Sequence, residues 1–104
     1  MEVDSQMNMI VRARVKPECV ADVQAGARKM FAALQQAQPE GVRYTSSVLP
    51  DGVTFLAQLE LRDGIDNPLP QVAAFREFQE NLKQWIAEPP IPEQLTVVGS
   101  YRSF

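Results

Sequence analysis

Few residues of this chain have side chains that could do chemistry, and histidine is not among them. The 104 residues include no histidine and one cysteine, Cys19. Histidine is the commonest metal ligand and has the only ordinary side-chain pKa near neutrality. A Ser-His triad is therefore excluded, a zinc site or a histidine-ligated haem is disfavoured, and we expect neither a metal nor a cofactor. Cys19 has no histidine to serve as its base, so we interpret it as a small half-buried residue.

Three polar residues in the middle of the chain are the catalytic candidates: Tyr44, Glu60 and Arg43. The phenol of Tyr44 could donate a hydrogen bond to an oxygen of a ligand or to a developing anion. Glu60 could act as a general base if apolar neighbours raised its pKa, and Arg43 could form part of a polar pocket floor. Each has a structural alternative. Tyr44 and Tyr101 would then place their hydroxyls at the surface, and the arginine and the glutamate would form ion pairs across neighbouring strands.

An aromatic stripe in the last third of the chain is the candidate for ligand binding. Phe75, Phe78 and Trp85 recur at helical spacing and could form the wall of a site for a flat aromatic ligand. The alternative is that they pack the core, where aromatic side chains bury large apolar areas. The segment DGIDN, residues 63–67, has a faint likeness to a cation-binding loop, but it lacks the longer ligand series that such a loop needs. We interpret it as a turn.

The first elements that must position these residues follow from periodicity. Apolar and polar residues alternate from Met7, which predicts a half-buried strand that Pro17 ends. A 3.6-residue apolar period follows and predicts a helix over residues 17–36, with proline in its first turn and Glu18 near its positive end.

A hairpin, a second helix and a last strand complete the series. VRYTSSVL and VTFLAQLEL predict two strands, and the Pro50-Asp51-Gly52 segment between them predicts a tight turn. Pro70 begins a second helix, which the proline cluster from Pro89 ends. Residues 95–104 are predicted to form the last strand.

The element order β-α-β-β-α-β predicts an α+β, ferredoxin-like domain over residues 7–104, preceded by a disordered lead-in at residues 1–6. In this plan a four-stranded antiparallel sheet carries two helices on one face, because right-handed crossovers place both helices there.

The opposite face of that sheet is then left open, although it is not purely polar. Whichever parity faces the helices, the open face carries Leu56 or Phe55 on one strand and Ile10 or Met9 on another. Uncovered apolar patches of this kind mark interfaces. We therefore predict a homodimer in which two sheets pack face to face.

The chain resembles the antibiotic biosynthesis monooxygenase family of small dimeric α+β barrels. The resemblance lies in the phrase VKPE at the start of the first helix, in GVRYTSSVLPDGVTFLAQLELRD through the hairpin, and in the helix and strand that follow. It extends over nearly the whole chain, from about Met7 to Phe104. It implies the ferredoxin-like fold, a dimer formed sheet to sheet, and a pocket in each subunit between sheet and helices.

The resemblance carries over less well to catalytic positions. In haem-degrading members the activity is carried by an asparagine on the first strand, a tryptophan late in the third strand and a histidine on the second helix. The corresponding places fall near Val11 or Arg12 and near Glu60 or Leu61, and the chain has no histidine. Asn8 lies too early on its strand to be equivalent. Haem degradation is therefore disfavoured.

We expect a cofactor-independent monooxygenase-like protein that acts on or binds an aromatic, polyketide-like small molecule. The alternative is a non-enzymatic homodimer that binds a small ligand or has a structural role. An open pocket with convergent polar groups would favour the first. A space filled by Phe31, Phe75, Phe78 and Trp85 would favour the second.

Charge and hydropathy set the remaining expectations. The net charge is -3, with acidic and basic residues interspersed. There is no basic stripe for a nucleic acid, and no apolar run has the length of a membrane span or a signal peptide. We expect no nucleic-acid partner, no membrane association and a cytoplasmic location.

Overall fold

The computed structural model describes residues 7–99 and residue 101, so the expected lead-in at residues 1–6 lies outside the described residues. The described chain follows the order β-α-β-β-α-β, with a short 3-10 turn before each helix. The strands are β1 (Met7–Arg14), β2 (Val42–Val48), β3 (Thr54–Leu61) and β4 (Ile91–Leu95), and the helices are α1 (Val20–Ala37) and α2 (Ala73–Trp85).

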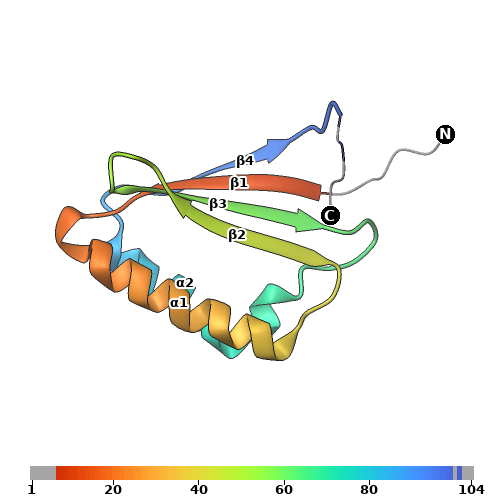
Figure 1. The fold of residues 1–104 in the computed structure, drawn as a ribbon, viewed down its shortest axis with the longest axis horizontal. Helices are drawn as coiled ribbons and strands as arrows, with labels where there is room; N and C mark the ends of the chain where they lie inside the picture. Colours follow the sequence, from red (N-terminus) through yellow and green to blue (C-terminus); the bar gives the residue numbers. More distant parts are fainter. Residues whose placement is uncertain (1–6, 100, 102–104) are drawn as a thin grey trace.

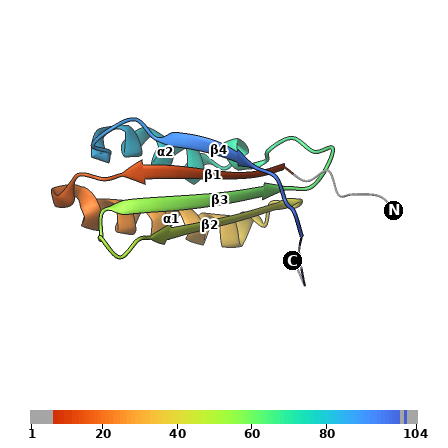
Figure 2. The ribbon, with the colours of Figure 1, turned by 90° about the horizontal axis from the view of Figure 1, so that it is seen from above.

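The strands form one antiparallel sheet in the order β2-β3-β1-β4. Both helices lie against the same face of this sheet (Figure 1). Seen from above, α1 lies behind β2 and β3, and α2 lies behind β1 and β4 (Figure 2). The predicted ferredoxin-like fold is confirmed, with one face of the sheet covered and the other uncovered.

The hairpin between β2 and β3 is fixed by its turn residues. The backbone N–H groups of Val53 and Thr54 donate to Oδ1 of Asp51, each over 2.9 Å, and the hydroxyl of Thr54 donates to Oδ2 over 2.6 Å. Gly52 follows with a φ of 78°, a conformation that glycine adopts without a steric penalty. The mechanism predicted for this turn is therefore confirmed.

Strand alternation sorts the sheet into two faces. Odd-numbered residues of β1 and β3 point toward the helices, where Val15, at the end of β1, packs with Val23, Met30 and Phe78 in the buried core. Even-numbered residues of β1 point to the outer face, which includes Ile10 and Arg12. Each face of β1 is continued on its neighbours by the cross-strand register.

The structure corrects the predicted helix starts. Pro17 and Pro70 each lie in a 3-10 turn, and the α-helices begin at Val20 and Ala73, three residues later than predicted. Proline lacks the backbone N–H donor but has φ near -65°, so it fits a tight turn at a helix entrance as well as the first helical turn.

The predicted last strand, residues 95–104, is wrong in position. β4 spans Ile91–Leu95, and residues 96–99 are not in a strand. The rest of the predicted strand, apart from Tyr101, lies outside the described residues. Pro92 lies within β4, although proline cannot donate a backbone hydrogen bond to a strand ladder. β4 is an edge strand, however, where a missing N–H donor on the open side is tolerated.

Candidate functional site

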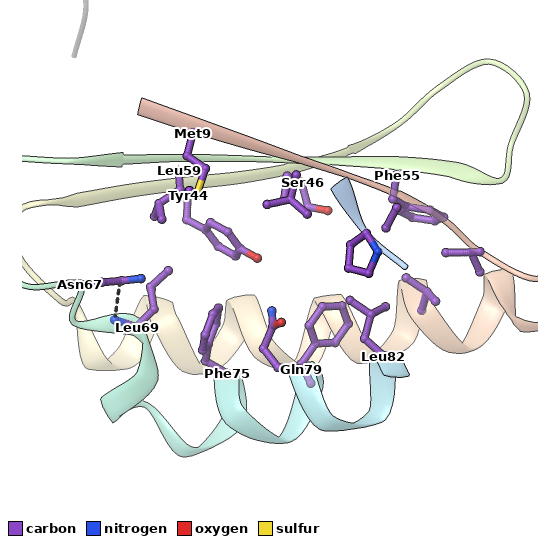
Figure 3. A pocket seen from close by; sticks show the side chains of 17 residues that line it. Met9, Tyr44, Ser46, Phe55, Leu59, Asn67, Leu69, Phe75, Gln79 and Leu82 are labelled. Atoms are coloured by element: carbon purple, nitrogen blue, oxygen red, sulfur yellow. Dashed lines mark hydrogen bonds between the residues drawn. The ribbon is translucent and has the colours of Figure 1, made fainter. Parts of the chain in front are cut away.

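The space between the sheet and the helices contains a cavity of about 210 Å³ (Figure 3). Its walls come from β1, β2, β3, α1 and α2 and from the segments on either side of α2. A cavity of ~150 Å³ lined by Leu, Ile and Phe is large enough to bind benzene. The space in this protein is therefore large enough for a ligand of one or two rings.

Apolar side chains form most of the cavity wall. Met9 of β1 and Leu59 of β3 lie above it, and Phe75 and Leu82 of α2 lie below it (Figure 3). Val11 of β1 also lines the cavity. Val11 is in the middle of the sheet yet only half-buried, because its side chain faces the empty space rather than a helix side chain. Such a wall favours the binding of an apolar, flat molecule.

Three polar side chains point into the cavity: Tyr44 and Ser46 from β2, and Gln79 from α2 (Figure 3). Ser46 and Gln79 are exposed, so they lie where the cavity reaches the surface. Asn67 also lies on the wall, but its Oδ1 accepts a hydrogen bond from the backbone N–H of Leu69 over 3.0 Å. Tyr44, Ser46 and Gln79 are therefore the groups that can orient a ligand.

Tyr44 is held in place by two aromatic rings. Its ring stacks on Phe31 of α1 with centroids 5.5 Å apart, and Phe75 of α2 meets it edge-on at 5.9 Å. Burial raises the pKa of the Tyr44 phenol above its ordinary value, because removal from water disfavours the phenolate. The hydroxyl is therefore protonated at neutral pH and can donate a hydrogen bond. It points into the cavity, and the alternative in which it lies at the surface does not describe the structure. Tyr101, by contrast, is 86% exposed.

The predicted aromatic wall is present in part. Phe75 and Phe78 line the cavity, whereas Trp85 is not among its lining residues. Trp85 packs into the core, 6.3 Å from Phe78 between ring centroids and against Gly26 of α1. Trp85 is the last residue of α2, and it lies where Gly26 leaves room for its ring. Its position is therefore that of a packing residue between the two helices.

Arg43 and Glu60 lie on the other face of the sheet from Tyr44. The two are cross-strand partners in the register of β2 and β3, and their side chains form an ion pair with Nη1 and Oε1 3.8 Å apart. Strand alternation explains the separation, because Tyr44 directly follows Arg43 and must point to the opposite face. The structure does not bring Arg43 or Glu60 to the cavity.

Sequence reasoning missed Ser46 and Gln79. The parity of β2 provides a signal for Ser46, since it shares a face with Tyr44 two residues earlier. Gln79 follows Phe78 on α2 and has the polar character of a solvent-facing residue, so no sequence pattern distinguishes it. Only the opening of the cavity beside α2 gives it a place in the site.

The cavity has little acid-base capacity of its own. Tyr44 is the one titratable group among its lining residues within the described part of the chain. Residues 7–99 and residue 101 also contain no cluster of three histidine, cysteine or acidic side chains able to hold a metal ion. Asn8 points to the outer face of the sheet and does not line the cavity. The site can orient a substrate and donate hydrogen bonds.

Comparison with known proteins supports the fold. No family model matches the sequence, and no curated protein matches it. Among solved structures, a protein of Nitrosomonas europaea assigned as an antibiotic biosynthesis monooxygenase is 17% identical, with a TM-score of 0.77 over 94% of this chain and 95% of that one. A Caulobacter crescentus protein with the same assignment is 16% identical, with a TM-score of 0.70 over 92% of both chains.

A third solved structure is a variant of SnoaB, described as a cofactor-independent oxygenase from Streptomyces nogalater. It is 13% identical to this chain, with a TM-score of 0.70 over 94% of this chain and 98% of that one. None of the described helices is both long and apolar enough to cross a membrane. The resemblance predicted from the sequence is thus confirmed in three dimensions: this chain has the ferredoxin-like fold of the antibiotic biosynthesis monooxygenases.

Proposed function

We propose that this protein is a homodimeric, cofactor-independent oxygenase of a small aromatic compound with an acidic phenol or enol. The observation that carries the proposal is the apolar cavity of about 210 Å³, into which the protonated hydroxyl of Tyr44 points. The fold supports it, because one of the solved proteins of this fold is described as a cofactor-independent oxygenase.

The chemistry would depend on the substrate. A substrate with an acidic C–H next to a phenol or ketone loses a proton to water, and its carbanion passes one electron to dioxygen. The resulting radicals combine to form a C–O bond. Cleavage of the O–O bond with loss of the second C–H proton leaves a ketone and one water, so CH₂ and O₂ become C=O and H₂O.

The protein would contribute position and hydrogen bonds to this reaction. The Phe75 and Leu82 side chains would hold the substrate ring, and the hydroxyl of Tyr44 would donate to the oxygen that bears the negative charge. A donor fixed in an apolar space stabilises such an anion more than water does, because it needs no reorganisation.

Oxygen uptake by the purified protein tests the proposal. The panel would contain one- to three-ring phenols and aryl ketones that carry an acidic CH₂ group, with anthrones as the three-ring members. We expect catalysed uptake with one- or two-ring members, and a loss of at least about tenfold in kcat/KM for Tyr44→Phe, which keeps the ring but removes the donor. Ala57→Phe, which fills the cavity from β3, should abolish binding, whereas Ala21→Phe on the exposed side of α1 should not. A flat response to the whole panel would refute the activity.

The second candidate is a non-enzymatic carrier of the same class of ligand. The absence of a carboxylate, lysine or arginine among the described cavity residues favours it, since a binding site needs no base. A thermal shift with a ligand, cancelled by Ala57→Phe but without oxygen uptake, would support this candidate over the enzyme.

A further inference from the structure

A row of small side chains crosses the sheet above the cavity. Ser46 of β2 is paired with Ala57 of β3, and Ala57 is paired with Val11 of β1. Directly paired residues of antiparallel strands share a face, and all three side chains line the cavity. Neighbouring strands lie about 4.8 Å apart, so the row extends roughly 10 Å across the sheet, at right angles to the strands.

This row is bounded on both sides along the strands. Two residues away on one side, the next row consists of Tyr44, Leu59 and Met9, which are all large. Two residues away on the other side are Phe55 and Ala13, and Ala13 is only 7% exposed, so no free space adjoins it. A ligand in the cavity can therefore extend across the strands but has little room to extend along them.

Both ends of the row reach the surface. β2 and β4 are the edge strands of the sheet, and α2 lies behind β1 and β4 whereas α1 lies behind β2 and β3 (Figure 2). Ser46 is exposed at the β2 edge, and Gln79 of α2 and Pro90, the residue before β4, are exposed on the β4 side. All three line the same cavity, so it opens at two opposite edges of the sheet.

The middle of the row faces space that the helices do not fill. Ala57 and Val11 lie on the two central strands, and both are only half-buried. Side chains between a sheet and its helices are close-packed in most proteins. The exposure of this pair therefore indicates a continuous passage between the two openings.

The two ends of this passage differ in chemistry. Among the described lining residues, the hydroxyl groups belong to Tyr44 and Ser46, and both are on β2. The part below β1 is lined by apolar side chains such as Phe78 and Leu82, with Gln79 at the surface. An oxygen of a ligand is favoured at the β2 end, and an apolar extension is favoured at the β4 end.

We propose that the cavity is a channel that crosses the sheet from β2 to β4 and selects elongated phenols. The oxygen of the ligand lies beside Tyr44 and Ser46, the ring lies under Ala57 and Val11, and a linear apolar substituent opposite the oxygen leaves between α2 and β4. The proposal rests on the proposed function, because it uses the same cavity, and it narrows the substrate class to phenols extended opposite the oxygen.

A series of para-alkylphenols, from para-ethylphenol to para-octylphenol, tests the channel by isothermal titration calorimetry. The octyl compound is longer than the row of small side chains, so its chain must leave through the β4 opening. We expect the Kd of the wild type not to rise along the series. We expect ortho-octylphenol to bind at least about tenfold more weakly than para-octylphenol, because its chain points along the strands into the large side chains.

A variant that narrows the β4 opening localises the exit of the chain. Gln79→Trp should raise the ratio of the Kd of para-octylphenol to that of para-ethylphenol at least about tenfold. Gln84→Trp is the matched control, because Gln84 is an exposed glutamine of the same helix that does not line the cavity, and it should leave the ratio unchanged. Circular dichroism checks that both variants fold. The wild-type series decides the question if Gln79→Trp does not.

The outcomes separate the channel from the proposed oxygenase. The titrations are made under nitrogen and so measure binding alone. A wild-type Kd that rises once the chain exceeds the row, equal Kd values for the ortho and para isomers, or no binding of any member would overturn the channel. Oxygen uptake is measured separately: uptake without this shape selectivity would leave the oxygenase standing, and shape-selective binding without uptake would support the channel in a carrier.

Discussion

At the scale of single residues, Tyr44 is the group on which the site depends. Its neighbours Phe31 and Phe75 fix the ring, and burial keeps the phenol protonated. It can therefore donate a hydrogen bond but cannot serve as a base at neutral pH. A reaction in this cavity would take its proton acceptor from water, so its rate should follow the ionisation of the substrate.

The raised pKa of Tyr44 predicts a loss of stability at high pH. The unfolded chain has the ordinary tyrosine pKa of about 10. The folded pKa is higher, so the contribution of the buried neutral phenol is complete below about pH 10 and is lost as the pH rises through the folded pKa. We expect the free energy of unfolding, measured in urea from pH 8 to 12, to fall less steeply in Tyr44→Phe than in the wild type.

Tyr101→Phe is the matched control for this experiment, because the Tyr101 side chain is 86% exposed. It should follow the wild-type curve. Equal slopes for all three proteins would contradict a desolvated phenol at Tyr44.

Asp51 gives the turn between β2 and β3 its acid sensitivity. The hydrogen bond from the hydroxyl of Thr54, with the backbone N–H groups of Thr54 and Val53, lowers the pKa of the Asp51 carboxyl. The stabilisation is complete above the ordinary aspartate pKa of about 4 and is lost as the pH falls through the lowered folded value. Asp51→Ala should lower the melting temperature at pH 7, and the gap to the wild type should narrow below about pH 4. If the difference in melting temperature between the two proteins were the same at every pH, the ionised carboxylate of Asp51 would not be the stabilising form.

At the scale of elements, Gly26 of α1 lies directly against the aromatic side chains of α2. A Cβ built on Gly26 would lie 3.2 Å from Cδ1 of Phe78 and 3.2 Å from Cζ3 of Trp85. Glycine inside a helix costs about 1 kcal/mol relative to alanine, so its presence here is explained by the space it leaves. The contact sets the separation of α1 and α2 and places Phe78 against the cavity.

Gly26→Leu should therefore destabilise the protein despite its better helix propensity. Overpacking against Phe78 and Trp85 costs about 1–3 kcal/mol, more than the gain in propensity. Urea unfolding measures the difference. Ala25→Leu is the control, because Ala25 is the exposed neighbour on the same helix and should change stability by less than about 0.5 kcal/mol. Equal changes in the free energy of unfolding at the two positions would mean that α1 and α2 can move apart without cost.

At the scale of the whole molecule, one face of the sheet lines the cavity and is covered by the helices. The other face is uncovered and carries exposed apolar side chains. Ile91 and Leu95 on β4 are 59% and 40% exposed, and the donor of Asn8 is buried without a partner. A second copy on this face would satisfy both features. The cavity and the uncovered face lie on opposite sides of the sheet.

The proposed homodimer predicts that thermal stability depends on protein concentration. Association stabilises only folded chains, so each tenfold rise in concentration adds about 1.4 kcal/mol per dimer and should raise Tm by about 3–6 °C. Scanning calorimetry at protein concentrations of about 5, 50 and 500 μM measures this dependence of Tm on concentration. A concentration-independent Tm in the wild type would argue for a monomer.

The sequence by itself determined the order of elements and the alternation of faces along the first three strands. Alternation from Met7 and the chemistry of the turn at Asp51 depend on near neighbours in the chain, and such local signals survive without knowledge of the fold. The same signals placed Tyr44, Phe75 and Phe78 on elements that face one another, because the β-α-β-β-α-β order and right-handed crossovers leave one arrangement of the helices.

The tertiary structure alone decided which of these residues share a site. A cavity exists because the side chains of the helices do not fill the space beneath Val11, and that mismatch of volumes has no signature in the sequence. The register of β4 is equally non-local. Only its pairing with β1 brings Ile91 and Glu93 beside Arg12 and Ile10.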